Sequence, residues 1–287
     1  MVAFGASAPA IAADWSVYDE NSVAQLDNQA WSVFLETQTQ VDRGRTLVGY
    51  KALNTRALSV LDSYISGLER IPVSQLNKNE QLAFWLNLHN ALTVKTLYNA
   101  GGNGDVDRHR TFPQATDGPF AKKTVTIEGQ LLSIDDIVNV VLRPNFEKPM
   151  LHYGLFYGAE GSTPLRREAY TGAKVEEQLA DLARTYVNSN DGVKAGRRKI
   201  QVSAMYDWYR DDFGGSDEAI LTHVAQFAEG RTAERLAGRT EIDRFNYDFD
   251  MAAFAPRPQP SASSFQNAPG GGFAGGGGGG GGFGGGS

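Results

Sequence analysis

The feature that most constrains the fold is a long segment that is apolar on nearly every side, residues 77–102, "NKNEQLAFWLNLHNALTVKTLYNAGG". Asn77 can cap the start of a helix, and Glu80 three residues later completes the pattern of a capping box. Gly101 and Gly102 are suited to end it. A helix that carries apolar side chains all round is stable only where it is buried. We therefore predict a central helix over this segment, around which the rest of the domain packs.

The flanking segments predict more helices and a few short strands. Helices are expected over 15–70, from Ser133 to about Arg143, and over 174–188, 204–213 and 216–230. Strands are expected at 124–127, 151–157, 199–203 and 241–251. The strands do not alternate regularly with the helices. We predict a single α+β domain over residues 14–254 that is predominantly helical, with a small mixed or antiparallel sheet.

Composition excludes several classes of function. The formal net charge is −6, which argues against a nucleic-acid surface, because such surfaces need clustered Lys and Arg. The chain has no cysteine, so disulfides, thiolate metal sites and a cysteine nucleophile are excluded. No apolar run reaches 18 residues, and no integral membrane segment is expected. Residues 255–287 are rich in Pro and Ser and then in Gly, which is typical of a disordered tail.

The first residues suggest a targeting signal. "MVAFGASAPAIAADW" contains Ala10-Ile11-Ala12, a small-x-small pattern of the kind that signal peptidase cleaves. The segment before it is short and lacks positive charge. We interpret residues 1–13 as the remnant of a signal peptide that starts upstream, and expect the domain to be exported to the periplasm or secreted. An unstructured Ala-rich start is the alternative.

The first candidate site lies in "HYGLFYGAEGSTPLRREAY", residues 152–170. His152 interrupts the apolar strand expected there, and Gly158 and Gly161 permit a tight turn with close backbone approach. Ser162 or Thr163 can cap a following helix, whose first N–H groups would suit an anion or an oxyanion. The segment is open to two interpretations. It is either a connection with a satisfied core histidine, or a site in which Ser162 or a bound ligand faces His152.

The second candidate site is on the central helix. Asn87 and Asn90 lie about 60° apart on one face, while His89 points elsewhere. Buried amides need partners, so these two either brace nearby loops or line a polar pocket beside His152. His89, His109 and His223 show no metal-binding spacing, so we expect no metal; no cofactor is predicted either.

Several motifs in order carry a family resemblance: "NEQLAFWLNLHNALTVKTLY", "LLSIDDIVNVVLR", "LHYGLFYGAEGSTPLRREAY", "VSAMYDWYRDDFG" and "FNYDFD". Together they resemble the family called domain of unknown function 547, over roughly residues 75–251. The resemblance implies a fold and a site, but no settled activity. The family pattern has two cysteines where this chain has Tyr157 and Ser162. A family site that depended on a thiol or a disulfide would therefore be altered or lost here.

Two functions follow from these residues. The first is a binding module that holds a small anionic or peptide-like ligand in a polar pocket formed by Asn87, Asn90, His152, Gly158, Gly161 and Thr163. The second is a hydrolase or acyl-transferase relative that uses Ser162 as nucleophile and His152 as base, in an active or an inactive form. The sequence leaves both open, and it does not predict the oligomeric state.

Overall fold

The central helix predicted from the sequence is present. The computed structural model describes residues 13–106, 117–146 and 149–254, and helix α3 (Lys78–Asn99) is buried along most of its length. The side chain of Asn77 accepts a hydrogen bond from the Glu80 N–H at 3.0 Å, as a cap should. The Glu80 carboxylate does not return to Asn77. It accepts the N–H groups of Leu26 and Gly172, both at 2.8 Å, and so ties two distant loops to the start of the helix.

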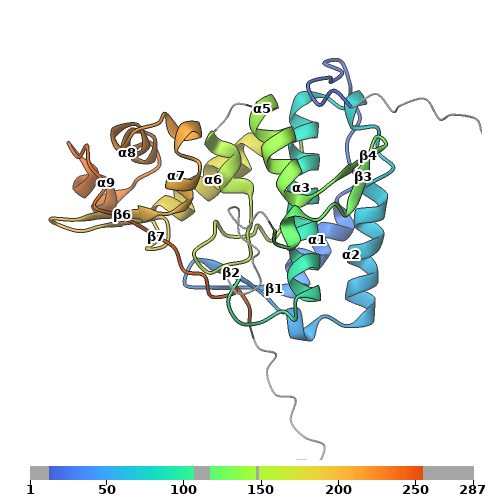
Figure 1. Ribbon diagram of the computed structural model, residues 1–287, viewed down its shortest axis with the longest axis horizontal. Coiled ribbons are helices and arrows are strands. Elements are labelled where there is room, and N and C mark those ends of the chain that lie inside the picture. Colours follow the sequence, from blue (N-terminus) through green and yellow to red (C-terminus); the bar gives the residue numbers. More distant parts are fainter. Residues whose placement is uncertain (1–12, 107–116, 147–148, 255–287) are drawn as a thin grey trace, which may run out of the picture. The chain divides into compact units, whose positions relative to one another are not determined.

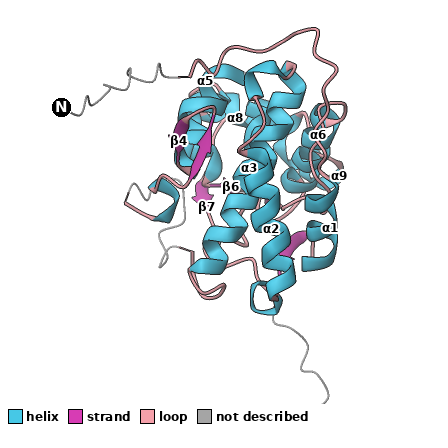
Figure 2. Ribbon diagram, turned by 90° about the vertical axis from the view of Figure 1, so that its right-hand side faces the viewer, coloured by secondary structure: helices cyan, strands magenta, loops and turns pink. Residues whose placement is uncertain are grey.

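Two helices, two strands and two 3₁₀ helices precede α3 in the chain. Helix α1 (Gln29–Gln38) packs on α2 (Thr55–Leu68), and α2 packs on α3 (Figures 1 and 2). Strands β1 (Thr39–Asp42) and β2 (Arg45–Val48) form an antiparallel hairpin between α1 and α2. Short 3₁₀ helices occupy Tyr50–Ala52 and Val73–Gln75.

The middle of the chain packs against α3 from other directions. A 3₁₀ turn at Pro119–Ala121 precedes the antiparallel hairpin of β3 (Val125–Ile127) and β4 (Gln130–Leu132). Helix α4 (Ile134–Asp136) continues through a π-helical turn (Ile137–Leu142) into α5 (Arg143–Phe146). Helix α6 (Val175–Val187) packs on α3 and on a 3₁₀ helix at Pro149–Gly154.

The last part of the described chain builds a three-stranded sheet with small helices (Figure 1). Strand β5 (Val193–Ala195) pairs antiparallel with β6 (Ile200–Ser203), which pairs parallel with β7 (Arg244–Asn246). Between β6 and β7 the chain forms α7 (Met205–Trp208), a 3₁₀ helix (Arg210–Phe213), α8 (Asp217–Ala225) and α9 (Gly230–Leu236).

The predicted fold class is confirmed. Helices dominate, and the strands form small sheets of two or three members that do not alternate regularly with the helices, which defines an α+β domain. Ser133 starts a helix with both hydrogen bonds of a capping box, and the helix predicted at 174–188 is α6. Within the described ranges, no helix is long and apolar enough to cross a membrane. The predicted leader at 1–13 and tail at 255–287 lie almost entirely outside those ranges.

The expectation of helix over residues 15–70 is wrong at 15–28, which form turns and irregular structure before α1. It is also wrong at 39–48, where the chain forms the β1–β2 hairpin. Arg43 and Gly44 connect the strands with φ angles of 50° and 84°. Two successive positive φ angles give a turn whose twist matches that of the flanking strands. The β-branched residues at 39, 41, 46 and 48 flank this turn, and they were a usable sequence signal for it.

The expectation of a strand at 151–157 followed by a helix after Thr163 is also wrong. Residues Pro149–Gly154 form a 3₁₀ helix, and the chain after Pro164 stays irregular until α6 begins at Val175. The backbone of this region is hydrogen-bonded by side chains instead of by a neighbouring strand. Asn90, for example, bonds both the Gly154 carbonyl and the Phe156 N–H, each at 3.0 Å. Buried backbone groups need partners, but they do not have to come from a sheet.

Candidate functional site

His152 is completely buried and is held by a carboxylate that lies 60 residues further along the chain. Its Nε2 atom lies 2.7 Å from Oδ2 of Asp212. The imidazole also stacks on the ring of Tyr209, with a centroid distance of 4.1 Å, and lies 5.5 Å from the ring of Phe213. The segment Tyr209–Phe213, which sequence reasoning described only as a helix, therefore supplies the immediate surroundings of His152.

The contact with Asp212 determines which nitrogen of His152 carries the proton. An ionised carboxylate only accepts hydrogen bonds, so Nε2–H must be the donor. Burial lowers the pKa of His152 below its usual value, although Asp212 opposes this shift. The ring is therefore neutral near pH 7, and Nδ1 is left as an acceptor. This atom is buried and has no hydrogen-bond partner in the described part of the chain.

Arg143 holds the other side of the same carboxylate. Its Nε and one terminal nitrogen donate to the two oxygens of Asp212 at 2.6 and 2.9 Å, a bidentate pair. Burial alone would raise the pKa of Asp212, but the hydrogen bonds from His152 and Arg143 outweigh it and hold this pKa well below its usual range. The guanidinium also lies over the ring of Tyr209, 5.2 Å from its centroid. Arg143 keeps 30% of its side-chain surface exposed, so this charge is the accessible edge of the site.

Two tyrosine hydroxyls extend the site inward. The hydroxyls of Tyr157 and Tyr209 are 2.8 Å apart and form a hydrogen bond. Burial raises the pKa of both phenols, so both carry their protons at neutral pH. The ring of Tyr157 meets His89 edge to face at 5.4 Å. Burial also lowers the pKa of His89 to about 4, and its Nε2 atom is a second buried nitrogen without a partner in the described ranges.

Asp135 completes the site. It lies in the first turn of α4, is partly exposed, and its negative charge is close enough to contribute to the raised pKa values of Tyr157 and Tyr209. Burial, and then repulsion by Asp136, raises the pKa of the Asp135 carboxyl to about 6. Titratable groups with strongly shifted pKa values gather at functional sites more often than elsewhere. We call the following residues the His152 cluster: Asp135, Arg143, His152, Tyr157, Tyr209 and Asp212.

The two asparagines of the central helix contact backbone. Asn87 exchanges two hydrogen bonds of 2.9 Å with the carbonyl and N–H of Tyr170. Asn90 bonds Gly154 and Phe156, as described above, and its Oδ1 atom also lies 3.0 Å from Nδ1 of His89. Both asparagines are buried. Asn90 therefore holds the segment that carries His152 and Tyr157, whereas Asn87 holds the loop at Tyr170. The role of both in holding a ligand stays a prediction.

The turn at 158–163 forms hydrogen bonds with neighbouring residues of its own segment and with the C-terminal segment at 248–250. The N–H groups of Glu160 and Gly161 donate to the carbonyls of Asp250 and Asp248, at 2.7 and 2.9 Å. The hydroxyl of Ser162 accepts the Tyr157 N–H at 2.9 Å and donates to the Thr163 carbonyl at 3.1 Å.

The other two predicted residues of the turn have structural partners as well. The hydroxyl of Thr163 donates to the Leu155 carbonyl at 2.6 Å. Gly158 has a φ of +80°, and a Cβ there would lie 2.0 Å from a methyl group of Leu97. Only glycine fits both conditions.

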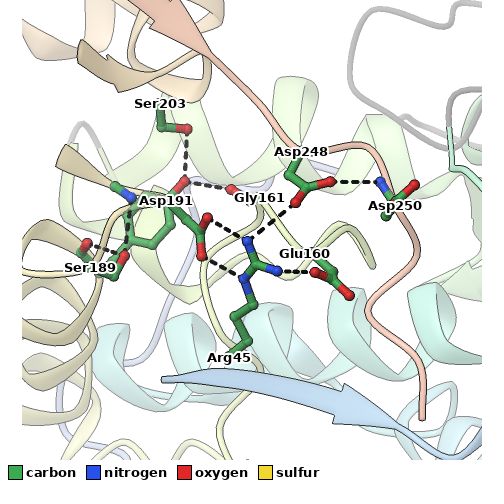
Figure 3. Close-up of polar contacts among 10 residues, drawn as sticks. Arg45, Glu160, Gly161, Ser189, Asp191, Ser203, Asp248 and Asp250 are labelled. Carbon is green, nitrogen blue, oxygen red and sulfur yellow. Dashed lines mark hydrogen bonds and ion pairs between the residues drawn. The ribbon is translucent and has the colours of Figure 1, made fainter. Parts of the chain in front are cut away.

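Figure 3 shows what anchors this turn. The guanidinium of Arg45, at the start of β2, lies between the carboxylates of Glu160, Asp191 and Asp248. The pair with Asp191 is bidentate, at 2.7 Å for both bonds, and the contact with Asp248 is 3.2 Å. Arg45 therefore joins the first hairpin, the 158–163 turn, the loop before β5 and the C-terminal segment.

The structure brings the predicted residues together only in part. His152 and Ser162 each have their own partners, and no hydrogen bond joins them in the described chain. The path between them runs from His152 through Tyr209 and Tyr157 to the Ser162 hydroxyl.

Sequence reasoning missed Arg143, Asp212, Tyr209 and Asp135 as site residues. Each occurs in a motif that carries the family resemblance, so the motifs themselves were the available signal. Among the described residues, no three His, Asp or Glu side chains are grouped as a metal site would require.

Comparison with known proteins places part of the chain in a family. The curated proteins and the solved structures contain none that matches this chain. A family model does match, over a segment that contains α3, Asp135, Arg143, His152 and the 158–163 turn, and that ends with α6. The segment that supplies Tyr209 and Asp212 follows the matched residues. The resemblance seen in the sequence is therefore confirmed: residues 73–187 match the family described as "Protein of unknown function, DUF547".

Proposed function

We propose that the chain is a binding module and that the His152 cluster recognises a small anionic or peptide-like ligand. The observation that carries this proposal is the buried Nδ1 atom of His152, which is an acceptor without a partner in the described chain. Leaving such an atom unpaired costs about 1–3 kcal/mol. A ligand N–H group that reached this atom would recover that free energy.

Two other groups of the cluster, Arg143 and Asp135, can bind the charged groups of such a ligand. Arg143 donates to Asp212 and, from its third nitrogen, to Asn139 at 3.0 Å. It is still partly exposed, so the second N–H of each terminal nitrogen can donate to a carboxylate. The carboxyl of Asp135 has a pKa of about 6 and can accept from an ammonium or amide group when it is ionised. A molecule with a carboxylate and an N–H donor a few bonds apart, such as an amino acid or a short peptide, carries the complementary groups.

The proposal can be tested by ligand screening. Free amino acids, dipeptides and simple carboxylates should be screened by the shift in melting temperature, since a ligand stabilises the folded state by mass action. We expect Arg143→Gln to weaken binding of a carboxylate ligand by at least tenfold. Arg210→Gln is a matched control, because Arg210 is equally exposed, is paired with two aspartates and lies 5.1 Å from the ring centre of Phe245. Equal loss of affinity in both variants would overturn the assignment of Arg143.

A hydrolase or acyl-transferase is the second candidate function, and the His152–Asp212 pair is the observation that favours it. A carboxylate that fixes the tautomer of a histidine is how many hydrolases prepare a base. A nucleophile would have to approach Nδ1, whereas the Ser162 hydroxyl is bonded to Tyr157 and Thr163. Turnover of activated esters that is lost in both Ser162→Ala and His152→Gln would favour the enzyme. Ligand binding that survives Ser162→Ala, without any turnover in the unaltered chain, would favour the binding module.

A further inference from the structure

Two neighbouring clefts are lined by residues far from the His152 cluster in the sequence, and they share no residue with it. The first cleft has a volume of about 450 Å³ and lies between α2 and the residues that lead into α1. The second has a volume of about 370 Å³ and lies between residues 19–26 and 71–76. Both are lined by Leu26 and Ile71, so they are neighbours. Each volume is in the range of small-molecule sites.

The first cleft is mainly apolar, and its space remains open because a glycine, Gly67, lines it where a larger side chain would fill it. Tyr64 and Leu68 of α2 form part of its wall and are themselves packed in the core. Gly67 lies between them in sequence on the same helix, and a Cβ built there meets no atom within 4 Å. The wall behind is rigid, because the Tyr64 hydroxyl donates to Asn28 at 2.7 Å and the Tyr64 ring stacks on Trp31 at 5.7 Å. The cleft is therefore a preformed apolar surface.

The charged residues of the two clefts are of one sign. Asp27 lines the first and Asp19 lines the second, and neither lining contains Lys or Arg. One oxygen of each carboxylate accepts a nearby backbone N–H, from Gln29 and Asn21 respectively, both at 3.0 Å. Neither carboxylate forms an ion pair with a described residue. Their negative charges therefore act on whatever occupies the clefts.

We propose that these clefts bind a small amphipathic cation, with its apolar chain against Tyr64, Leu68 and Ile71 and its ammonium group beside Asp27 or Asp19. Burial of the chain supplies most of the affinity, and the two carboxylates select a positive head group over a negative one. This site is independent of the His152 cluster, so each proposal can fail without the other.

The experiment compares three probes with the same chain and different heads. Decylammonium, decanol and decanoate are titrated into the full chain by calorimetry, the two ions below their micelle concentrations and decanol below its solubility limit. We expect decylammonium to bind at least tenfold more tightly than decanoate, with decanol between them. Equal affinities for the three, or no binding of any, would overturn the proposal. Self-association of the chain through this face, blocked by Gly67→Leu, would overturn it as well by making the clefts an interface between copies.

Two sets of variants locate the site. Asp19→Asn with Asp27→Asn keeps both backbone acceptors and removes both charges, and we expect the preference for decylammonium to fall to threefold or less. Asp62→Asn is the control, because Asp62 is on α2 but pairs with Lys95. Gly67→Leu should abolish binding of all three probes. Ser66→Leu, at the preceding and exposed position, should not. Leucine favours helix over glycine, so both variants should fold. Unchanged binding in Gly67→Leu would show that the probes bind elsewhere.

Discussion

At the scale of single residues, Asp135 is a group whose ionisation opposes folding. A carboxyl whose pKa is raised in the folded state favours folding at low pH, and this contribution is lost as pH rises from the unfolded value near 4 to the folded value of about 6. Asp135→Asn removes that dependence. We expect the stability of the variant relative to the unaltered chain to improve by roughly 1–2 kcal/mol between pH 4 and pH 7, after allowance for the partial exposure of the carboxyl.

Urea unfolding at several pH values measures this difference. Asp136→Asn is the contrasting variant, because the Asp136 carboxylate accepts bonds from Ser133 and Lys123 and its pKa is lowered. Its relative stability should change in the opposite direction, because a lowered pKa contributes stability that is present above the unfolded value and lost as pH falls. Parallel pH profiles for the two variants would contradict the account of Asp135.

Asn87 of α3 is expected to contribute to stability through buried backbone groups. Its amide bonds both the carbonyl and the N–H of Tyr170. In Asn87→Ala the N–H would be left buried and unpaired, whereas the carbonyl would keep its bond from the Asn28 side chain at 3.1 Å. We expect a loss of about 1–3 kcal/mol in the free energy of unfolding. Asn188→Ala tests whether burial is the cause of the loss. The Asn188 side chain also bonds backbone groups, those of Arg184, Phe227 and Glu229, but it is exposed. That variant should lose less than about 1 kcal/mol, since water replaces the missing amide.

At the scale of elements, the 158–163 turn depends on close packing against the end of α3. Gly158 and Gly215 both have a φ of +80°, but a Cβ at Gly158 would collide with Leu97, whereas one at Gly215 meets nothing within 4 Å. Alanine at either position should lose about 1 kcal/mol to backbone strain. Gly158→Ala should lose roughly 1–3 kcal/mol more through the collision. Thermal unfolding compares them, and equal losses would mean that the turn can move away from α3.

At the scale of the whole described domain, Arg45 joins four segments that are remote in sequence. Arg45→Gln leaves Glu160, Asp191 and Asp248 near one another without a cation. We expect a loss of about 1–3 kcal/mol, of which a part is recovered in 0.5 M salt because screening reduces repulsion between carboxylates. Arg184→Gln is the control, since Arg184 forms one exposed pair with Asp181 on the same helix. Stability should be measured by unfolding in urea, because the denaturant guanidinium chloride is itself a salt and would screen the charges. A loss that salt does not reduce would show that Arg45 acts through packing alone.

Export of the chain remains a proposal at this scale, because Ala10-Ile11-Ala12 lies outside the described residues. We expect the mature protein, recovered from its native source, to begin near Ala13 or Asp14. Mass spectrometry of the intact protein measures this directly. An intact Met1 on protein taken from the cytoplasm would contradict it.

The sequence by itself determined the elements whose signals are local. The all-round apolar pattern and the Asn77 cap identified α3, and Ser133 identified the start of α4, because capping and periodicity involve residues within one or two turns. The helical α+β class followed from counting such elements. The motifs around His152 and Asn87 also marked the right region of the chain, although they did not say which groups their side chains would meet.

Only the tertiary structure decided which residues pair through hydrogen bonds and ion pairs at the candidate site and around it. Asp212 reaches His152 across 60 residues, Arg45 reaches Asp248 across 203, and Asn87 bonds Tyr170 across 83. A carboxylate, a guanidinium or an amide can bond many alternatives, so residue type does not select among them; the packing of the core does, by placing one partner within reach. The same reason explains the mistaken strand at 151–157. An apolar run signals burial, but whether a neighbouring strand or an asparagine from α3 satisfies its backbone depends on what packs beside it.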